Sequence, residues 1–197
     1  MRRRVDDGGP PDSSIPPSIK RQIIANSPAA RLPKDFVDRR RAFFGGAIEA
    51  AMLPALVLLA SMIGFGSLAR GSGIGLLVAL VSTVGVWGLP GQIAFVELYA
   101  IGASALVVIV AVSVANARFL PMTLSMLPII RRGPGIRPWH FIAAQMISIN
   151  IWTWNMRRCP ELPHEQRVPF YFGFAIACMT SALIGTVAGF VLAVALP

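Results

Sequence analysis

The sequence predicts an all-α, polytopic transmembrane helix bundle with kinked or broken helices, built from about five apolar segments. Hydrophobic residues make up 55% of the 197 residues and charged residues only 14%, against about 25% charged in an average soluble domain. Several apolar stretches reach the length of about 20 residues that a helix needs to cross a bilayer. A soluble fold of this size has too little interior to bury so much apolar surface. We therefore expect a multi-pass protein of the cell (cytoplasmic) membrane.

Residues 1–41 differ in composition from the rest of the chain. They hold ten of the eighteen Lys and Arg, five acidic residues and many prolines. This composition is typical of a disordered segment, so we predict a disordered basic cytoplasmic arm over 1–41 and a transmembrane helical domain over 42–197. The positive-inside rule places the arm in the cytoplasm, where we expect it to meet lipid rather than nucleic acid.

The first apolar segment, residues 42–69, contains a proline that predicts a kink. Pro54 has no backbone N–H, so the carbonyl of Ala50 lacks its helical partner. Glu49 precedes this carbonyl in the sequence. Polar backbone at membrane depth persists only where protein or water covers it, so the kink is either a packing feature or part of a site.

The second apolar region, residues 74–101, is interrupted by Gly88-Leu-Pro-Gly91. It is long for one membrane crossing and short for two. The region is therefore either one kinked helix or two half-helices that meet near the middle of the bilayer. In the second case Gln92 lies at the positive end of a half-helix, where an anionic group is favoured. Glu97 follows on the same half-helix.

The third segment, residues 103–128, contains the one formal charge between residues 98 and 130, Arg118. Arginine stays charged at ordinary pH, and at a bilayer centre it costs about 3 kcal/mol on insertion scales. Such a residue either faces a partner, cavity or substrate or extends to a lipid headgroup. Pro121 predicts a local break of the helix, which would bring Asn116 and Arg118 together.

The fourth segment, residues 139–156, is short and carries Asn150 among other amides. Basic residues gather in loops on both sides of it, at 131–137 and 157–167. With a cytoplasmic N-terminus and single crossings, the first loop lies outside, against the positive-inside rule. If residues 74–101 form a re-entrant hairpin, the first loop moves inside but the second moves outside. We favour the hairpin.

The last apolar segment, residues 170–196, has a small residue at every fourth position, which makes a groove for close helix packing. The row includes a GxxxG motif and predicts contact with another helix, in this chain or in a partner. Its members are Gly173, Ala177, Ser181, Gly185, Gly189 and Ala193.

Residues with catalytic or metal-binding chemistry are sparse. The chain has two cysteines, Cys159 and Cys178, and two histidines, His140 and His164. A zinc site usually takes four ligands, and acid–base catalysis needs a positioned titrating group. We therefore expect no metal, no cofactor and no enzyme activity.

Several of these motifs, taken in order, resemble the AzlC family of branched-chain amino-acid permeases. The stretch Trp87-Gly-Leu-Pro-Gly-Gln92-Ile resembles the family's aromatic-Ala-Gly-Ala/Ser-x-Gln-Phe motif. Asn116-Ala-Arg118-Phe resembles its Asn/Asp-x-Arg-His motif, and the GxxxG motif resembles its later Gly-Thr-x-x-Gly. The resemblance covers about residues 43–197.

The resemblance implies a permease subunit that exports branched-chain or other small amino acids. It also implies a small AzlD-like membrane subunit as partner. The residues expected to bind the solute are Gln92, Asn116, Arg118 and Asn150, and the expected charge partners of the arginine are Glu49 and Glu97.

The chain departs from the family pattern at three points. Phe119 replaces the usual histidine, and Ser148-Ile-Asn150 replaces a Thr-Asp-Glu motif. The chain also stops at Pro197, where the family continues with further apolar segments. These departures leave a second hypothesis, a truncated, non-transporting paralogue that acts as a membrane scaffold or regulatory subunit through its row of small residues.

Overall fold

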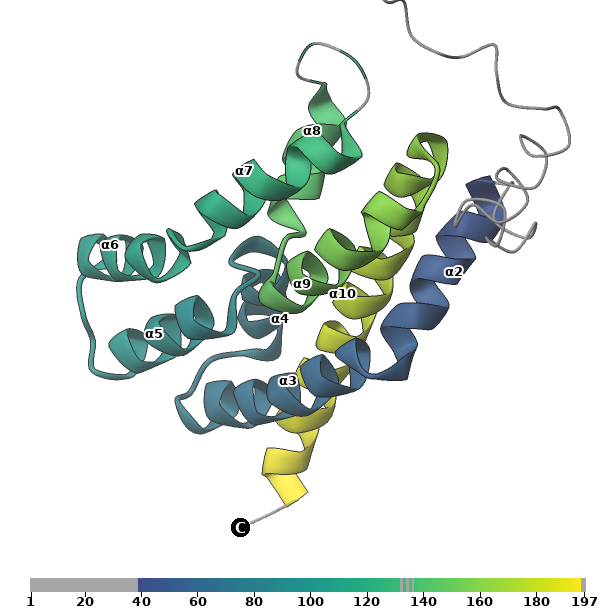
Figure 1. Ribbon diagram of the computed structural model, residues 1–197. Coiled ribbons are helices and arrows are strands. Elements are labelled where there is room, and N and C mark those ends of the chain that lie inside the picture. Colours follow the sequence, from purple (N-terminus) through teal and green to yellow (C-terminus); the bar gives the residue numbers. More distant parts are fainter. Residues whose placement is uncertain (1–38, 132, 134, 136, 196–197) are drawn as a thin grey trace, which may run out of the picture. The chain divides into compact units, whose positions relative to one another are not determined.

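The computed structural model describes residues 39–131, 133, 135 and 137–195. The chain divides into two units, residues 1–34 and 35–197, and all described residues belong to the second. The predicted all-α class is confirmed, because the described residues form helices and no strand (Figure 1). The helices are α2 Arg39–Met52, α3 Pro54–Gly71, α4 Leu76–Gly85, α5 Leu89–Ala100, α6 Ala105–Asn116, α7 Phe119–Ile130, α8 Pro138–Gln145, α9 Ile149–Arg158, the 3-10 turn η3 Cys159–Glu161, and α10 His164–Ala195.

The predicted arm over 1–41 lies almost wholly outside the described residues. The first described helix, α2, begins at Arg39, three residues before the predicted start of the helical domain at residue 42.

Two described helices are long and apolar enough to cross a membrane, Pro54–Gly71 and His164–Val194. The pair α6 and α7 makes a third candidate span, bent by 47° at its break. The remaining helices are too short to cross alone, since a crossing takes about 20 residues. The fold therefore combines long spans with half-helices.

Three of the helix breaks lie where the sequence predicts them. Pro54 is the first residue of α3, where its missing N–H interrupts no helical hydrogen bond. Residues 86–88 separate α4 from α5, so the region over 74–101 is two half-helices. The bend between α6 and α7 lies at residues 117–118, shortly before Pro121.

A fourth break was not predicted, because the segment over 139–156 was expected to be one helix. The structure divides it at residues 146–148 into α8 and α9. This stretch contains neither proline nor glycine, so local sequence gives no signal for a break. Contacts from elsewhere in the chain stabilise it: the Trp87 Nε1 donates to the Met146 carbonyl at 2.9 Å, and the Ser148 Oγ caps α9.

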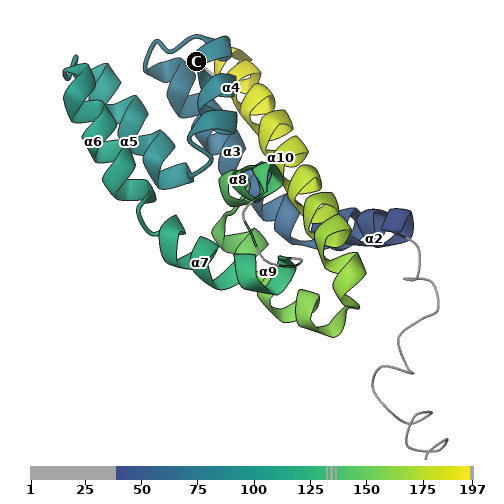
Figure 2. The same cartoon turned by 90° about the horizontal axis from the view of Figure 1, so that it is seen from above.

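Helix α10 lies along α2 and α3 and runs in the same direction as both (Figure 2). Near its start, Gly173 meets the Phe43 backbone, and further along Gly189 meets the Ile63 backbone. A Cβ built on Gly66 would lie 2.2 Å from the Thr186 carbonyl oxygen. Side chains larger than hydrogen do not fit at these crossings, so the helices approach through glycine.

The small-residue row is therefore occupied within this chain. Its three glycines are buried against α2 and α3, and its other members, Ala177, Ser181 and Ala193, are half-buried.

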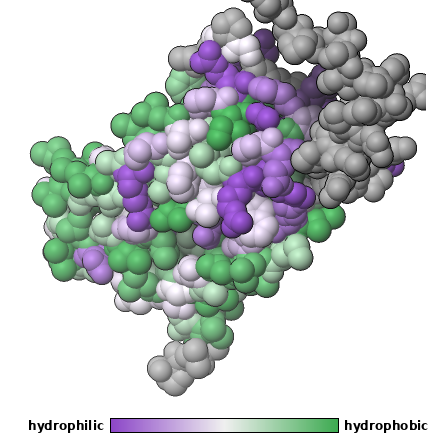
Figure 3. Space-filling view, viewed as in Figure 1, coloured by the Kyte–Doolittle hydropathy of each residue, from purple (hydrophilic) through white to green (hydrophobic). Residues whose placement is uncertain are grey.

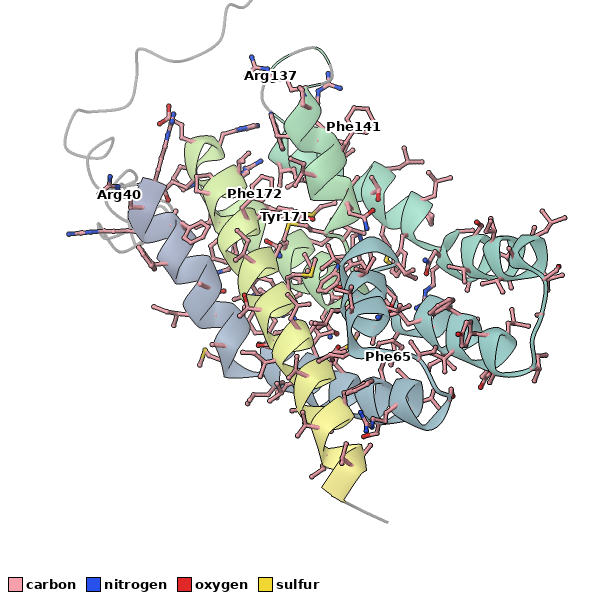
Figure 4. The ribbon with its side chains drawn as sticks, turned by 180° about the vertical axis from the view of Figure 1, so that it is seen from behind. Arg40, Phe65, Arg137, Phe141, Tyr171 and Phe172 are labelled. Atoms are coloured by element: carbon pink, nitrogen blue, oxygen red, sulfur yellow. The ribbon has the colours of Figure 1, made fainter. Side chains whose placement is uncertain are left out.

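The starts of α2, α8 and α10 lie at one end of the bundle, since Arg39, Arg137 and Val168 line one cavity there. The end of α7 lies at the same end, because Arg167 donates to the Ile129 carbonyl. We call this the basic end, and Arg40 and Arg137 mark it in Figure 4. Its described arginines are Arg39, Arg40, Arg41, Arg131, Arg137, Arg157, Arg158 and Arg167.

Two hairpins enter the bundle from opposite ends. The α8–α9 hairpin starts at the basic end and returns there, where Arg167 binds the Leu162 carbonyl that follows η3. The α4–α5 hairpin starts just beyond the far end of α3. Their tips meet, because the Gln145 Nε2 donates to the Val84 and Gly85 carbonyls at 3.2 and 2.7 Å.

The second hairpin allows both basic loops to lie on the same side of the membrane. With one hairpin, the loops at 131–137 and 157–167 fall on opposite sides. With two, both loops and the start of α2 fall at the basic end.

Much of the remaining surface is apolar (Figure 3). Helix α6 buries none of its residues and exposes large side chains such as Leu106 and Val114, which are 71% and 70% exposed. Exposed apolar area on this scale suits a lipid environment.

Candidate functional site

A cavity of about 180 Å³ lies where the two hairpin tips meet. Its walls come from α3, from the breaks before α5 and α9, and from the bend before α7. The lining residues are Leu58, Ser61, Met62, Trp87, Gly88, Leu89, Pro90, Arg118, Phe119, Ser148, Ile149 and Asn150.

Two helices begin at this cavity. Helix α5 starts at Leu89 and α9 starts at Ile149. The first backbone N–H groups of a helix have no carbonyl partner inside it, and the helix dipole makes this end positive. The cavity therefore offers two positive helix ends to an anionic group.

Arg118 lines the same cavity at its exposed rim and adds a full positive charge there. It lies in the bend between α6 and α7, and its guanidinium carbon is 5.2 Å from the centre of the Phe119 ring. No acid among the described residues forms an ion pair with it. The guanidinium is thus available to a carboxylate, with which it can form two parallel hydrogen bonds.

The structure places neither predicted charge partner, Glu49 or Glu97, in an ion pair with Arg118. Glu49 instead pairs with Arg158, whose Nη2 lies 2.9 Å from its Oε1, and accepts from the Trp154 Nε1 at 2.9 Å. Glu97 is exposed on α5 and forms no ion pair with a described residue. Sequence could not indicate this pairing, because Glu49 and Arg158 are separated by 109 positions.

Gln92 and Asn116, two of the residues predicted to bind the solute, are not among the residues that line this cavity. Gln92 is fully buried, and its Nε2 donates to the Thr83 Oγ1 at 3.1 Å. Asn116 donates to the Val86 carbonyl at 3.2 Å and packs against Gly88. Both amides hold the break before α5 in place. Asn150, the fourth predicted residue, does line the cavity beside Arg118.

Two residues that hold the hairpin tips were not identified from the sequence as site residues. Trp87 is buried and lines the cavity, and its backbone φ of 44° lies in the left-handed region, a conformation that costs about 1–3 kcal/mol outside glycine. Gln145 joins the tips through the two carbonyls of α4. The motif around Trp87 was visible in the sequence, but the role of Gln145 depends on which breaks meet in space.

Trp87→Phe is expected to loosen the junction of the tips. The change keeps an aromatic ring but removes the donor to Met146, which should lower the unfolding free energy by about 1 kcal/mol. Thermal unfolding in detergent measures this loss. Trp139→Phe is the matched control, because the Trp139 indole N–H donates to no described residue; equal losses in both variants would contradict the account.

A second cavity, of about 440 Å³, lies between α2 and α9 and contains the Glu49–Arg158 pair. Glu161 is the other partner of Arg158, and its side chain is 59% exposed against 18% for Glu49. The inner pair holds the α8–α9 hairpin against α2.

Glu49→Gln should therefore destabilise the fold more than Glu161→Gln does. Removing the inner partner leaves a half-buried guanidinium short of a counter-charge and should cost more than 1 kcal/mol, whereas exposed pairs contribute about 0.2–1 kcal/mol. Thermal unfolding of both variants tests the order, and a larger loss for Glu161→Gln would reverse it.

A comparison with models of protein families assigns the chain to a family. The model of the AzlC protein family matches residues 54–196, which include every residue that lines the cavity. The chain belongs to the AzlC family. No curated protein and no solved structure matches it.

Membership of the AzlC family, together with the apolar helices, makes this chain a membrane protein of a transport-related family. The match begins at Pro54, so α2 with Glu49 lies before it. The hairpins, the bend at Arg118 and the parallel contact of α3 with α10 all lie within the AzlC region.

Proposed function

We propose that this AzlC protein is a permease subunit that exports branched-chain or other small amino acids, and that the cavity between the hairpin tips binds the solute. The observation that carries the proposal is the convergence of Arg118 with the starts of α5 and α9. Half-helices that meet inside a bundle are a common form of transporter site.

The cavity suits the two ends of such a solute. The carboxylate would lie against Arg118 and the positive ends of α5 and α9. The apolar walls, which include Leu58, Met62 and Ile149, suit an aliphatic side chain. The cavity volume of about 180 Å³ limits the solute to a small one.

The small-residue row does not favour the scaffold hypothesis. Gly173, Gly185 and Gly189 pack against the backbones of α2 and α3, so these glycines have no free face for a partner. A small AzlD-like subunit remains part of the proposal, and α6, which is exposed along its length, offers it a surface.

We propose that the basic end faces the cytoplasm, as the positive-inside rule requires. Arg157→Cys at the basic end should then react with a membrane-impermeant thiol reagent only after cells are permeabilised. Ile101→Cys, in the 78% exposed turn between α5 and α6, should react in intact cells. The reverse pattern would overturn this orientation.

Efflux from loaded cells tests the transport function. Cells that express the chain, with and without a small AzlD-like subunit, are loaded with a panel of radiolabelled amino acids. Faster loss of branched-chain amino acids than in cells without the chain is the expected result. Unchanged efflux of the whole panel, with the protein present in the membrane, would overturn the permease function.

A further inference from the structure

The cavity is lined by a positive charge and by no negative one. Arg118 is the one charged residue among its lining residues, all of which are described. The polar side chains there are already engaged in part: the Ser61 Oγ donates to the Val57 carbonyl, and the Ser148 Oγ caps α9. The two helix starts add further positive potential.

A solute with an ammonium group finds no counter-charge in this cavity. Glu49 is held by Arg158 and Trp154 in the second cavity, and Glu97 is exposed on α5 and is not among the lining residues. Arg118 and Ile149, which line the cavity, are exposed, so the cavity is open on one side and an ammonium in it gains no ion partner. The ammonium of an amino acid would therefore meet only neutral oxygen atoms and a positive potential.

Positions 149 and 150 explain why the counter-charge is missing. Both residues line the same cavity as Arg118, and neither carries a charge. An acid at either position would share the cavity with the guanidinium and offset its charge. With Ile149 and Asn150 instead, the cavity keeps a net positive charge.

We propose that the cavity selects its solute by the carboxylate alone and does not recognise an α-amino group. Small branched monocarboxylates that lack the amino group, such as 2-oxo acids, then bind at least as well as the amino acids. This inference rests on the proposed function and defines the substrate class of the same site.

Ligand-induced stabilisation of the purified full chain tests the selectivity. The probes are leucine, its 2-oxo acid 4-methyl-2-oxopentanoate, and 3-methylbutylamine, which is leucine without the carboxylate. The oxo acid should raise the unfolding temperature at least as much as leucine at equal concentration, and the amine should have no effect. Stabilisation by leucine but not by the oxo acid would overturn the inference and leave the proposed function standing; no stabilisation by either carboxylate would count against both.

Asn150→Asp provides the reciprocal test. The change is nearly isosteric and adds an acid beside Arg118, so affinity for the oxo acid should fall roughly tenfold or more relative to affinity for leucine. Thr153→Asp is the matched control, since it adds the same charge one turn along α9 outside the cavity lining. An unchanged ratio in Asn150→Asp, or an equal change in Thr153→Asp, would overturn the inference.

Discussion

Gly66→Ala is expected to separate α3 from α10 and to destabilise the described domain. The added Cβ would lie 2.2 Å from the Thr186 carbonyl oxygen and 2.8 Å from the Phe190 backbone nitrogen. Backbone atoms cannot turn aside as side chains do, so the helices must move apart. Overpacking of a well-packed interior costs about 1–3 kcal/mol, and a backbone clash of this kind should reach the upper part of that range.

The same helix contains the control for this substitution. Gly64 lies two positions earlier on α3, and a Cβ there meets nothing within 4 Å. Gly64→Ala should therefore leave stability unchanged or raise it slightly, because alanine favours a helix over glycine by about 1 kcal/mol.

The buried thiols of the chain provide the measurement. Cys159 and Cys178 are both fully buried, and burial raises the pKa of the Cys159 thiol to about 12, so the native protein should react slowly with a thiol-reactive dye. Heating in detergent exposes the thiols and reports unfolding. Equal unfolding temperatures for Gly66→Ala and Gly64→Ala would contradict the close contact between α3 and α10.

Arg118→Ala is expected to reduce amino-acid efflux strongly while the protein still inserts and folds. The guanidinium makes no ion pair with a described residue, so its removal should cost little stability. It would remove the proposed partner of the solute carboxylate, and a charged hydrogen bond contributes about 1.5–3 kcal/mol. Efflux should fall roughly ten- to a hundredfold.

Arg118→Lys should retain part of the activity, since it keeps the charge but loses the planar pair of donors. Arg70→Ala is the control, because it also removes an arginine but one that does not line the cavity. Arg70 lies near the end of α3, where its guanidinium carbon is 4.8 Å from the centre of the Phe190 ring. Efflux is compared at equal membrane abundance. Wild-type efflux by Arg118→Ala would remove this residue from the site.

The sequence was most informative where a residue lacks a backbone donor or a side chain. Pro54, the stretch from Gly88 to Gly91 and Pro121 each mark a break or bend that the structure contains. The break at residues 146–148 has no such residue, because a tryptophan from the other hairpin stabilises it. The residues around positions 146–148 therefore do not indicate the break, because the contact that stabilises it comes from a distant part of the chain.

The candidate site was predicted in part. Arg118 and Asn150 are polar residues in apolar segments of the sequence, and both line the cavity. Gln92 and Asn116 are also polar residues in apolar segments, but their side chains donate to the Thr83 hydroxyl and the Val86 carbonyl. Which polar residues share a cavity depends on how the hairpins meet, and that is set by contacts between residues far apart in the chain.

Protection of a cysteine placed in the cavity tests the location of the site most directly. Ile149→Cys lines the cavity, and its labelling by a small thiol reagent should slow when leucine is added. Met52 lines the second cavity and is 69% exposed. A cysteine at this position, Met52→Cys, should label at the same rate with and without leucine. Protection at position 149 that disappears in Arg118→Ala is the predicted result. Leucine efflux by Ile149→Cys without any protection of its thiol would show that the solute binds elsewhere.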